Sequence, residues 1–219
     1  MDQLLYFNRL ACPEDIKDFV LEGQARIDFK DGYMVMENAL PAQDGQKANY
    51  VLWCPEEFPS NVRIEWEFQP LTDIGLCILF FAARSMDGKD IFDKDLQPRT
   101  GEYALYHHGD IHTFHVSYYR RKEPTERVFH TCNLRKSYGF HLVAQGADPI
   151  PDARDCRDFY HMTIVKKDRE VTFWINDLQI FRYSDDGETY GEALGGGKIG
   201  FRQLAPLVAA YRNLRVYAK

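Results

Sequence analysis

The side chains most suited to chemistry are concentrated in the middle of the sequence. All seven histidines lie between positions 107 and 161, and segment 99–136 carries seven lysines and arginines against four acidic residues. The whole chain, by contrast, has a formal net charge of −6. Imidazole groups titrate near neutral pH and transfer protons, and arginine binds carboxylates and hydroxyls through a rigid fork of donors. The segment is therefore interpreted as a ligand-binding or catalytic region, against the plainer alternative of a polar sheet edge.

The alternation of apolar and polar residues predicts which of these side chains share a face. In segment 112–121, Phe114, Val116 and Tyr118 form an apolar set that suits a core. Successive side chains of a strand point to opposite faces, so the odd-numbered residues are expected on an open face. The same reasoning applies to the neighbouring predicted strands. The side chains expected to form this open binding face are Arg99, Tyr106, His108, His115, Ser117, Tyr119, Arg121, Asn133, Arg135 and Arg202.

Such a face suits the recognition of a sugar, because aromatic rings stack on pyranose rings and arginines bind hydroxyls and carboxylates. For β-elimination from a uronic sugar, a group must neutralise the carboxylate, and a base and an acid must move protons. We assign Arg121 or Arg135, with Asn133, to the carboxylate, and His115 and Tyr119 to proton transfer as candidate catalytic residues. The last two are four residues apart, about 13 Å along a strand, so both reach one bond only through a bend or a neighbouring strand.

Strand-like alternation dominates the sequence. Segment 62–68 alternates apolar and polar residues throughout, and segments 171–175 and 178–183 are predicted to pair as a hairpin. Two further predicted strands, 102–108 and 127–134, carry several of the candidate residues. Altogether about fourteen short strands, with glycine, proline and aspartate between them, indicate an all-β, two-sheet antiparallel sandwich.

Length and composition limit the class of protein. The 219 residues are 45% hydrophobic and 27% charged, without a linker or repeat, so residues 1–219 are expected to form a single globular domain. No apolar run approaches the ~20 residues of a membrane span, and the first residues lack a secretory signal. The five cysteines form no C-x-x-C pair and are expected as reduced thiols in the cytoplasm. A net negative charge without a basic run argues against nucleic acid as a partner.

The histidines lack the spacing of a simple metal site. His112 and His115 are three residues apart on a predicted strand, so they point to opposite faces. We therefore expect no catalytic metal and no cofactor. Segment 185–188, Asp-Asp-Gly-Glu, could hold a structural calcium ion, although a solvated turn is the preferred interpretation.

Three segments of the chain resemble a known family. They are RTGEYALYHHGDIHTFHVSYYRR (99–121), NLRKSYGFHLVAQGADPIPDA (133–153) and GGGKIGFRQLAPLVAAYRNLRVY (195–217). They are similar to the YesU-like family of uncharacterised proteins, within the concanavalin A-like (galectin-like) lectin/glucanase superfamily. The resemblance implies a jelly-roll sandwich and the cytoplasmic handling of pectin-type sugars such as rhamnogalacturonan products. It implies no catalytic residue.

The sequence lacks the motifs that carry the activities known in that superfamily. Retaining glucanases use the pattern E-x-D-x-x-E, which holds two carboxylates about 5–5.5 Å apart. The nearest match contains Glu65 and Glu67, with Pro70 in place of the third acid, so both glutamates are expected to solvate the outer face of a strand. The H-x-N-P-R strand of galectins and the Q-I-H strand of alginate lyases on a similar scaffold are absent from the sequence.

Three functions therefore remain open. The first is an enzyme, either a lyase or a hydrolase, acting on acidic oligosaccharides derived from pectin or rhamnogalacturonan. The second is a non-catalytic carbohydrate-binding protein of the same fold. The third is an interaction protein that uses the open face as a subunit interface, for example in a homodimer. An oligosaccharide is the expected partner, and the histidines of the face slightly favour the enzyme.

Overall fold

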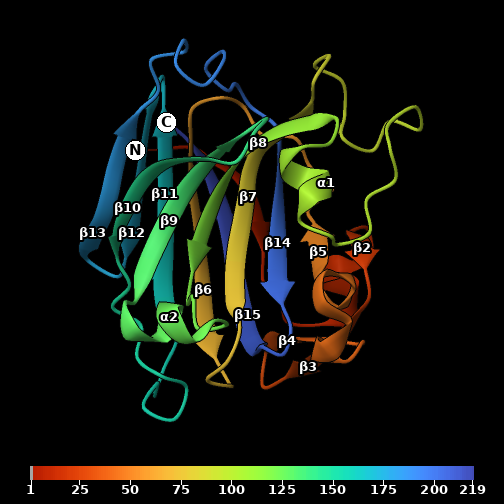
Figure 1. Cartoon of the computed structure of the whole chain (residues 1–219), viewed down its shortest axis with the longest axis vertical. Helices are drawn as coiled ribbons and strands as arrows, with labels where there is room; N and C mark the ends of the chain where they lie inside the picture. Colours follow the sequence, from red (N-terminus) through yellow and green to blue (C-terminus); the bar gives the residue numbers. More distant parts are fainter. Residues whose placement is uncertain (1) are drawn as a thin grey trace.

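Two antiparallel β-sheets packed face to face make up the protein. The computed structural model describes residues 2–219, and Figure 1 looks through both sheets. We call the rear sheet sheet A and the sheet nearer the viewer sheet B. Each sheet removes the apolar face of the other from water, which is why two sheets stack. The two-sheet, all-β sandwich predicted from the sequence is confirmed.

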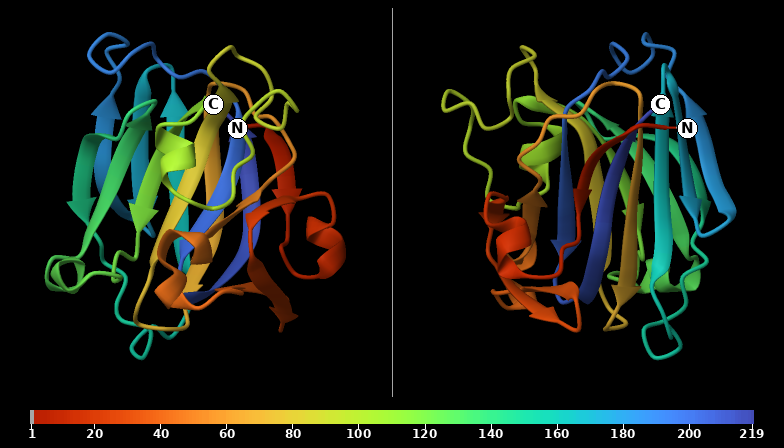
Figure 2. Two further views of the ribbon diagram at one scale, coloured as in Figure 1. Left: turned by 45° about the vertical axis from the view of Figure 1, so that its right-hand side comes forward. Right: turned by 180° about the vertical axis from the view of Figure 1, so that it is seen from behind.

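Sheet A contains the first and the last strands of the chain. Its order is β13 (Leu178–Ser184), β12 (Glu170–Ile175), β11 (Tyr160–Lys167), β6 (Val62–Pro70), β15 (Val208–Ala218), β4 (Tyr33–Asn38) and β3 (Ala25–Lys30), and β1 (Leu4–Asn8) also pairs with β15. An ion pair of 2.8 Å joins Asp2 and Lys219. The two ends of the chain lie close together in the rear view of Figure 2.

Sheet B carries most of the candidate residues. Its order is β10 (His141–Ala147), β9 (Thr131–Ser137), β8 (Ile111–Tyr118), β7 (Leu76–Ser85), β14 (Lys198–Leu204), β5 (Tyr50–Trp53) and β2 (Val20–Gly23). The helical segments are all short: η1 (Pro13–Ile16), η2 (Ala42–Ala48), α1 (Ala104–His107) and α2 (Pro124–Val128). Within residues 2–219, none is long and apolar enough to cross a membrane.

The core between the sheets consists of the side chains that alternation assigns to it. In β6, Ile64, Trp66 and Phe68 are fully buried, while the residues between them are partly exposed. Trp66 packs against Tyr118 of sheet B and Phe173 of sheet A, with ring centroids 5.8 and 6.4 Å away. Removing a large aromatic side chain from such a core typically costs about 3–5 kcal/mol of stability. These rings therefore fix the position of one sheet on the other.

The prediction of a strand at 102–108 is wrong, because this segment contains α1. Tyr103 and Tyr106 are three residues apart, which places both rings on the side of one helical turn that faces sheet B. Gly101 has a φ of 91°, and a Cβ at this position would lie 2.0 Å from the carbonyl oxygen of Asn49. The chain therefore leaves the sheet at this glycine, and α1 lies in front of sheet B (Figure 1).

The prediction of a strand at 127–134 is right only from Thr131, where β9 begins. Arg127 and Val128 belong to α2, which has Pro124 at its start and a capping box between Glu123 and Glu126. Proline in the first turn and a reciprocal cap both favour a helix over a strand. As a result, α2 stands beside the ends of β8 and β9 at the bottom of Figure 1.

The outer face of sheet B is only partly open. The chain between β7 and β8 folds back over it and forms a second apolar cluster with Trp53, Phe80, Ile91 and Tyr106, all buried. The ring of Phe80 stacks on both Trp53 and Tyr106, at centroid distances of 5.5 and 5.2 Å. The expectation of a wholly open face is therefore wrong where this cluster covers it.

Candidate functional site

A pocket of about 120 Å³ remains on the outer face of sheet B, between α1, α2 and the β9–β10 hairpin. We call it the central pocket. Its polar lining consists of Tyr103, Ser117, Arg120, Glu126, Asn133 and Arg135, and its apolar lining of Leu76, Ile78, Phe140 and Leu204.

Cross-strand register explains why three predicted binding residues meet in the central pocket. Ser117 of β8 pairs with Ile78 of β7 on one side and with Asn133 of β9 on the other. Paired residues of neighbouring strands project to the same face, so these side chains form one row across the sheet. Arg135 lies on the same face two residues beyond Asn133. The prediction that Ser117, Asn133 and Arg135 share a face is confirmed, although the first two are only 7% and 3% exposed.

Arg135 gives the central pocket an uncompensated positive charge. Its Nη1 donates to the carbonyl oxygen of Phe140 at 2.9 Å, and its guanidinium lies 3.8 Å from the centre of that ring. Within residues 2–219 it has no carboxylate partner. The pocket's second arginine is neutralised, because Arg120 donates to Glu126 at 2.8 Å and to Thr131 at 2.6 Å. A partly buried guanidinium without a counter-ion favours the binding of an anion.

Arg202 adds a second buried positive charge behind the wall of the central pocket. It was predicted to lie on the open face, but it is 0% exposed, because the ring of Tyr103 covers its guanidinium at 4.4 Å. Nη2 donates to Gln46 and to the Gly101 carbonyl, both at 3.1 Å. In the described part of the chain, Nε and Nη1 have no hydrogen-bond partner. Burial lowers the pKa of Arg202 to about 10.

His115, the predicted catalytic histidine, is a buried structural group rather than an accessible base. It is 1% exposed, and both ring nitrogens are engaged: Nδ1 with the Tyr103 hydroxyl at 3.0 Å and Nε2 with the Ser137 hydroxyl at 2.6 Å. Burial lowers the pKa of His115 well below its ordinary value, so the ring is neutral at pH 7. The alternation of residues correctly placed His115 on the outer face of sheet B. It does not line the central pocket, because Tyr103, to which it is hydrogen-bonded, does so instead.

The buried imidazole makes stability fall in mild acid. His115 stays neutral in the folded chain but takes up a proton in the unfolded chain below its ordinary pKa of about 6.5, so its stabilising contribution is complete above that pH and lost as the pH falls. We expect the free energy of unfolding to fall less steeply with decreasing pH in His115→Gln than in the wild-type protein. Below about pH 6 the two slopes should differ by ~1.4 kcal/mol per pH unit. Urea denaturation from pH 7.5 to 5 measures both slopes. Equal slopes in wild type and His115→Gln would contradict the assignment.

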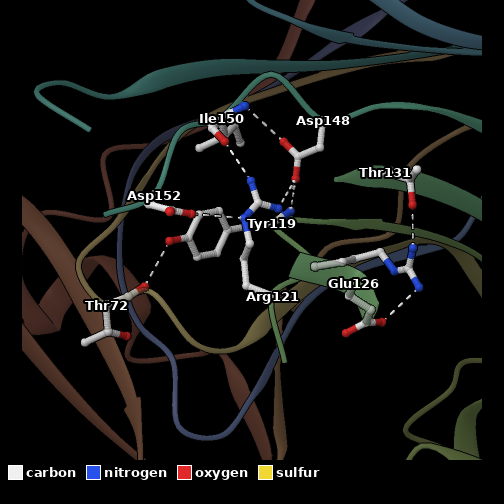
Figure 3. A network of polar contacts seen from close by, with 9 residues as sticks. Thr72, Tyr119, Arg121, Glu126, Thr131, Asp148, Ile150 and Asp152 are labelled. Atoms are coloured by element: carbon white, nitrogen blue, oxygen red, sulfur yellow. Dashed lines mark hydrogen bonds and ion pairs between the residues drawn. The ribbon is translucent and has the colours of Figure 1, made fainter. Parts of the chain in front are cut away.

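Tyr119, the second predicted catalytic residue, lies inside the core. β8 ends at Tyr118, and Tyr119 has a φ of 48°, which turns its side chain away from the odd-numbered face and into the space between the sheets. It is 0% exposed, and its hydroxyl donates to the carbonyl oxygen of Thr72 at 3.1 Å (Figure 3). Burial raises the pKa of this hydroxyl well above its ordinary value. Tyr119 therefore cannot act on a ligand in the central pocket.

Arg121, a predicted carboxylate-binding residue, already binds a carboxylate of the protein itself. Its Nη1 donates to Asp148 at 3.0 Å and its Nη2 to the carbonyl oxygen of Ile150 at 2.7 Å (Figure 3). Both charged side chains are almost completely buried. Asp148 also accepts the backbone N–H of Tyr119 at 2.8 Å. The arginine therefore holds the loop after β10 against the end of β8, and is not available to a ligand.

Arg99 and Tyr106 are also buried, whereas His108 stays at the surface. Arg99 donates to the Glu22 carboxylate at 2.7 and 3.2 Å, which fixes the covering chain segment to β2. The hydroxyl of Tyr106 accepts the N–H of Gly101 at 3.0 Å beneath α1. His108 is exposed at the rim of the face, where its ring meets Tyr138 of the β9–β10 hairpin at 5.5 Å.

Carboxylates are scarce at the central pocket. Glu126 is the acidic residue of its described lining, and its second oxygen accepts the N–H of Glu123 at 3.0 Å. Glu65 and Glu67 lie on the outer side of sheet A, where they pair with Arg63 at 3.1 Å and Arg212 at 2.6 Å. Their prediction as surface residues of an ordinary strand is confirmed. Hydrolysis by a pair of carboxylates therefore has no support at this pocket.

The 185–188 segment forms a turn whose acidic side chains are used within the protein. Asp185 pairs with the buried Lys136 at 2.8 Å, and Asp186 accepts the backbone N–H groups of Glu188 and Thr189 at 2.8 and 2.9 Å. In the described residues, no three His, Cys, Asp or Glu side chains are grouped as metal ligands.

Four polar or aromatic residues of the central pocket were missed by sequence reasoning: Tyr103, Arg120, Glu126 and Phe140. Tyr103 was placed in a supposed strand, while Arg120 follows the left-handed Tyr119 and Phe140 lies in a hairpin turn. A useful signal was the pair of glycines at 101 and 109 on either side of the supposed strand, since glycine commonly interrupts strands and marks turns.

Comparison with known proteins agrees with the fold. The sequence matches the family described as domain of unknown function (DUF1961) over residues 3–216. The chain belongs to the DUF1961 family. It is also similar to the uncharacterized protein YesU of Bacillus subtilis (strain 168), at 48% identity over 213 residues, which are 97% of this chain and 94% of YesU. The resemblance to YesU-like proteins found in the sequence is confirmed.

The fold of this DUF1961 protein is shared with solved structures. A crystal structure of a protein of unknown function with galectin-like fold from Bacillus subtilis has a TM-score of 0.95 at 46% identity, with 100% of this chain and 98% of that chain covered. The carbohydrate binding module CBM66 from Bacillus subtilis has a TM-score of 0.56 at 9% identity, with 91% and 95% covered. The first confirms the galectin-like (concanavalin A-like) jelly roll, and the second shows likeness of fold alone.

Proposed function

We propose that the protein binds an acidic oligosaccharide in the central pocket, with a uronate carboxylate held by Arg135. The observation that carries the proposal is the guanidinium of Arg135, which lines the pocket without a carboxylate partner in residues 2–219. Arg202 adds positive potential from behind Tyr103. In a chain of net charge −6, this concentration of unpaired positive charge singles out an anionic ligand.

The remaining lining suits a sugar ring. Phe140 and Tyr103 line the pocket edge to face at 5.4 Å, and the C–H groups of a pyranose can pack against the ring atoms that Arg135 and Arg202 leave uncovered. Ser117 and Asn133 supply a hydroxyl and an amide for sugar hydroxyls. The likeness of fold to a carbohydrate binding module supports the same class of ligand. Pectin-type uronates are the substrate class that we propose.

β-Elimination is a second candidate, because the Tyr103 hydroxyl lies 3.0 Å from His115 Nδ1 at the pocket wall. In that reaction a base removes the C5 proton, the C4–O bond breaks, the leaving oxygen takes a proton and a C4=C5 double bond forms. Burial raises the pKa of Tyr103 to about 12, so its hydroxyl is protonated and could supply the acid. Glu126, the acidic lining residue, is occupied by Arg120, so no free carboxylate in the described lining serves as base. Binding without reaction is therefore the first choice.

The test compares two sugars that differ only at C6. By calorimetry, D-galacturonate is expected to bind at least tenfold more tightly than D-galactose, because a charge-assisted hydrogen bond contributes about 1.5–3 kcal/mol. Raising the salt concentration should weaken the galacturonate complex alone. Equal affinities, or binding of neither sugar, would contradict the proposal. New absorbance near 235 nm in parallel incubations with trigalacturonate would favour elimination.

A further inference from the structure

A second and larger cavity lies on the other side of the β9–β10 hairpin from the central pocket. Its volume is about 480 Å³. We call it the hairpin pocket, and the residues that matter to it are His112, Lys136, Tyr138, His141, Tyr190 and Glu192. It is lined by the β9–β10 hairpin, by the chain between β13 and β14, and by Met86 and His112 at the β7–β8 connection. The opposite side of the hairpin contributes Phe140 to the central pocket.

A continuous series of rings joins the two pockets. Tyr103 of the central pocket meets His107 at a centroid distance of 4.9 Å, His107 meets His108 at 4.5 Å, and His108 meets Tyr138 of the hairpin pocket at 5.5 Å. Phe140 packs on the same His107 at 4.6 Å. These three contacts are edge to face, with 89°, 79° and 75° between the ring planes, so the series offers the C–H groups of a sugar chain a path of alternating ring edges and faces.

The hairpin pocket has the side chains of a sugar site. Tyr138 and Tyr190 are 49% and 37% exposed, which is high for tyrosines that are already in contact with other rings. Tyr190 stacks on His141 at a centroid distance of 4.4 Å, with 25° between the planes, so the tyrosine ring is held in a fixed orientation. A ring that is already oriented loses little conformational entropy when a ligand stacks on it.

The charge of the hairpin pocket is opposite to that of the central pocket. The Lys136 amine is neutralised, since it is bound by Asp185 at 2.8 Å and by the Gly191 carbonyl oxygen at 2.9 Å. His112 adds no positive charge at neutral pH, because burial lowers its pKa. Glu192 is exposed and forms no ion pair within residues 2–219. A carboxylate on a sugar in this pocket would be repelled by Glu192, whereas the hydroxyls of a neutral sugar would donate to it.

From this arrangement we infer that the ligand is a mixed oligosaccharide whose uronate occupies the central pocket and whose neutral sugar occupies the hairpin pocket. The inference rests on the proposed function for the uronate, and adds the second sugar and its lack of charge. The chain of rings over His107 and His108 carries the part of the ligand between the two pockets.

The test uses two tetrasaccharides with the wild-type protein and calorimetry. One alternates galacturonate and rhamnose, so a neutral neighbour is present in either chain direction, and the other is tetragalacturonate. We expect the alternating chain to bind more tightly than both tetragalacturonate and galacturonate alone. Tetragalacturonate offers more carboxylates to Arg135, so statistics alone predict the reverse order. Tighter binding of tetragalacturonate, or no gain over the monomer, would overturn the inference.

Two variants separate the pockets. Tyr190→Ala should weaken binding of the alternating tetrasaccharide about three- to tenfold, the usual effect of one stacked ring, and leave galacturonate unchanged. Glu192→Gln should raise the affinity for tetragalacturonate relative to the alternating chain, a change of preference that a folding defect does not produce. Glu170→Gln on sheet A, where the glutamate is partly exposed and pairs with Arg182, is the control for loss of a surface carboxylate and should change neither. If galacturonate itself does not bind, the proposed function fails; if it binds and neither variant has these effects, only the hairpin pocket is refuted.

Discussion

The variant Arg135→Gln is expected to weaken the binding of galacturonate by about 30-fold or more, while galactose binding stays the same. Removing one partner of a recessed, hydrogen-bonded charge pair costs about 2–5 kcal/mol, and each 1.4 kcal/mol is tenfold in affinity. Glutamine keeps a hydrogen-bond donor on a shorter side chain, so the loss reports the charge, the second donor and the reach of arginine together. Calorimetric titration with both sugars measures the effect.

Arg135→Lys and Arg182→Gln complete this experiment. Lysine keeps the charge but lacks the planar fork, so its complex should lie between wild type and glutamine in affinity. Arg182 pairs with Glu170 on sheet A and does not line the central pocket, so its change should have no effect on either sugar. Galacturonate bound by Arg135→Gln with wild-type affinity would remove the basis of the proposed function.

The largest effect on folding is expected from Arg121→Met, which should lower the free energy of unfolding by about 3–5 kcal/mol. The substitution leaves Asp148 charged and almost completely buried, with only backbone N–H groups to stabilise it. Methionine fills much of the same volume, so the loss comes from the missing charge and not from a cavity. Urea denaturation monitored by tryptophan fluorescence measures it.

A single-site control and a double variant define what the Arg121 result means. Arg154 lies in the loop after β10 that also contains Asp148, and like Arg121 it approaches Asp152. Because Arg154 is 76% exposed, Arg154→Met should lower the free energy of unfolding by less than about 1 kcal/mol. Arg121→Met combined with Asp148→Leu should recover part of the stability, because the uncompensated charge is then gone. Equal losses in Arg121→Met and Arg154→Met would show that the buried pair is not the cause.

Alternation in the sequence located the sandwich and part of the site, because both depend on regular strands. Ser117 and Asn133 meet as expected, since β8 and β9 pair without interruption from Thr113 to Ser117. In a strand, alternate side chains point to opposite faces, so the alternation of apolar and polar residues predicts directly which side chains share a face.

The errors arose where a single backbone conformation or a loop decides the position. One positive φ at Tyr119 moves that ring from the outer face to the core. Local alternation cannot show such a change, nor that the partner of Arg121 is Asp148, 27 residues later. The fold-back of α1 over sheet B likewise depends on Gly101 and on contacts with Trp53 and Phe80 that are distant in sequence. Tyr119, Arg121 and Tyr106 were predicted to contact a ligand, but these backbone and long-range effects place them in buried positions that stabilise the fold.

The position of the two chain ends, close to each other on sheet A, determines where a tag, a surface or a fusion partner can be attached. Asp2 and Lys219 form an ion pair beside the β1–β15 pair of sheet A, whereas the central pocket opens from sheet B. A tag, a surface or a fusion partner joined to either end therefore sits behind the pocket and leaves it free. Because the ends are neighbours, a short linker can close them, and new ends can be opened at an exposed loop tip with the strand order kept.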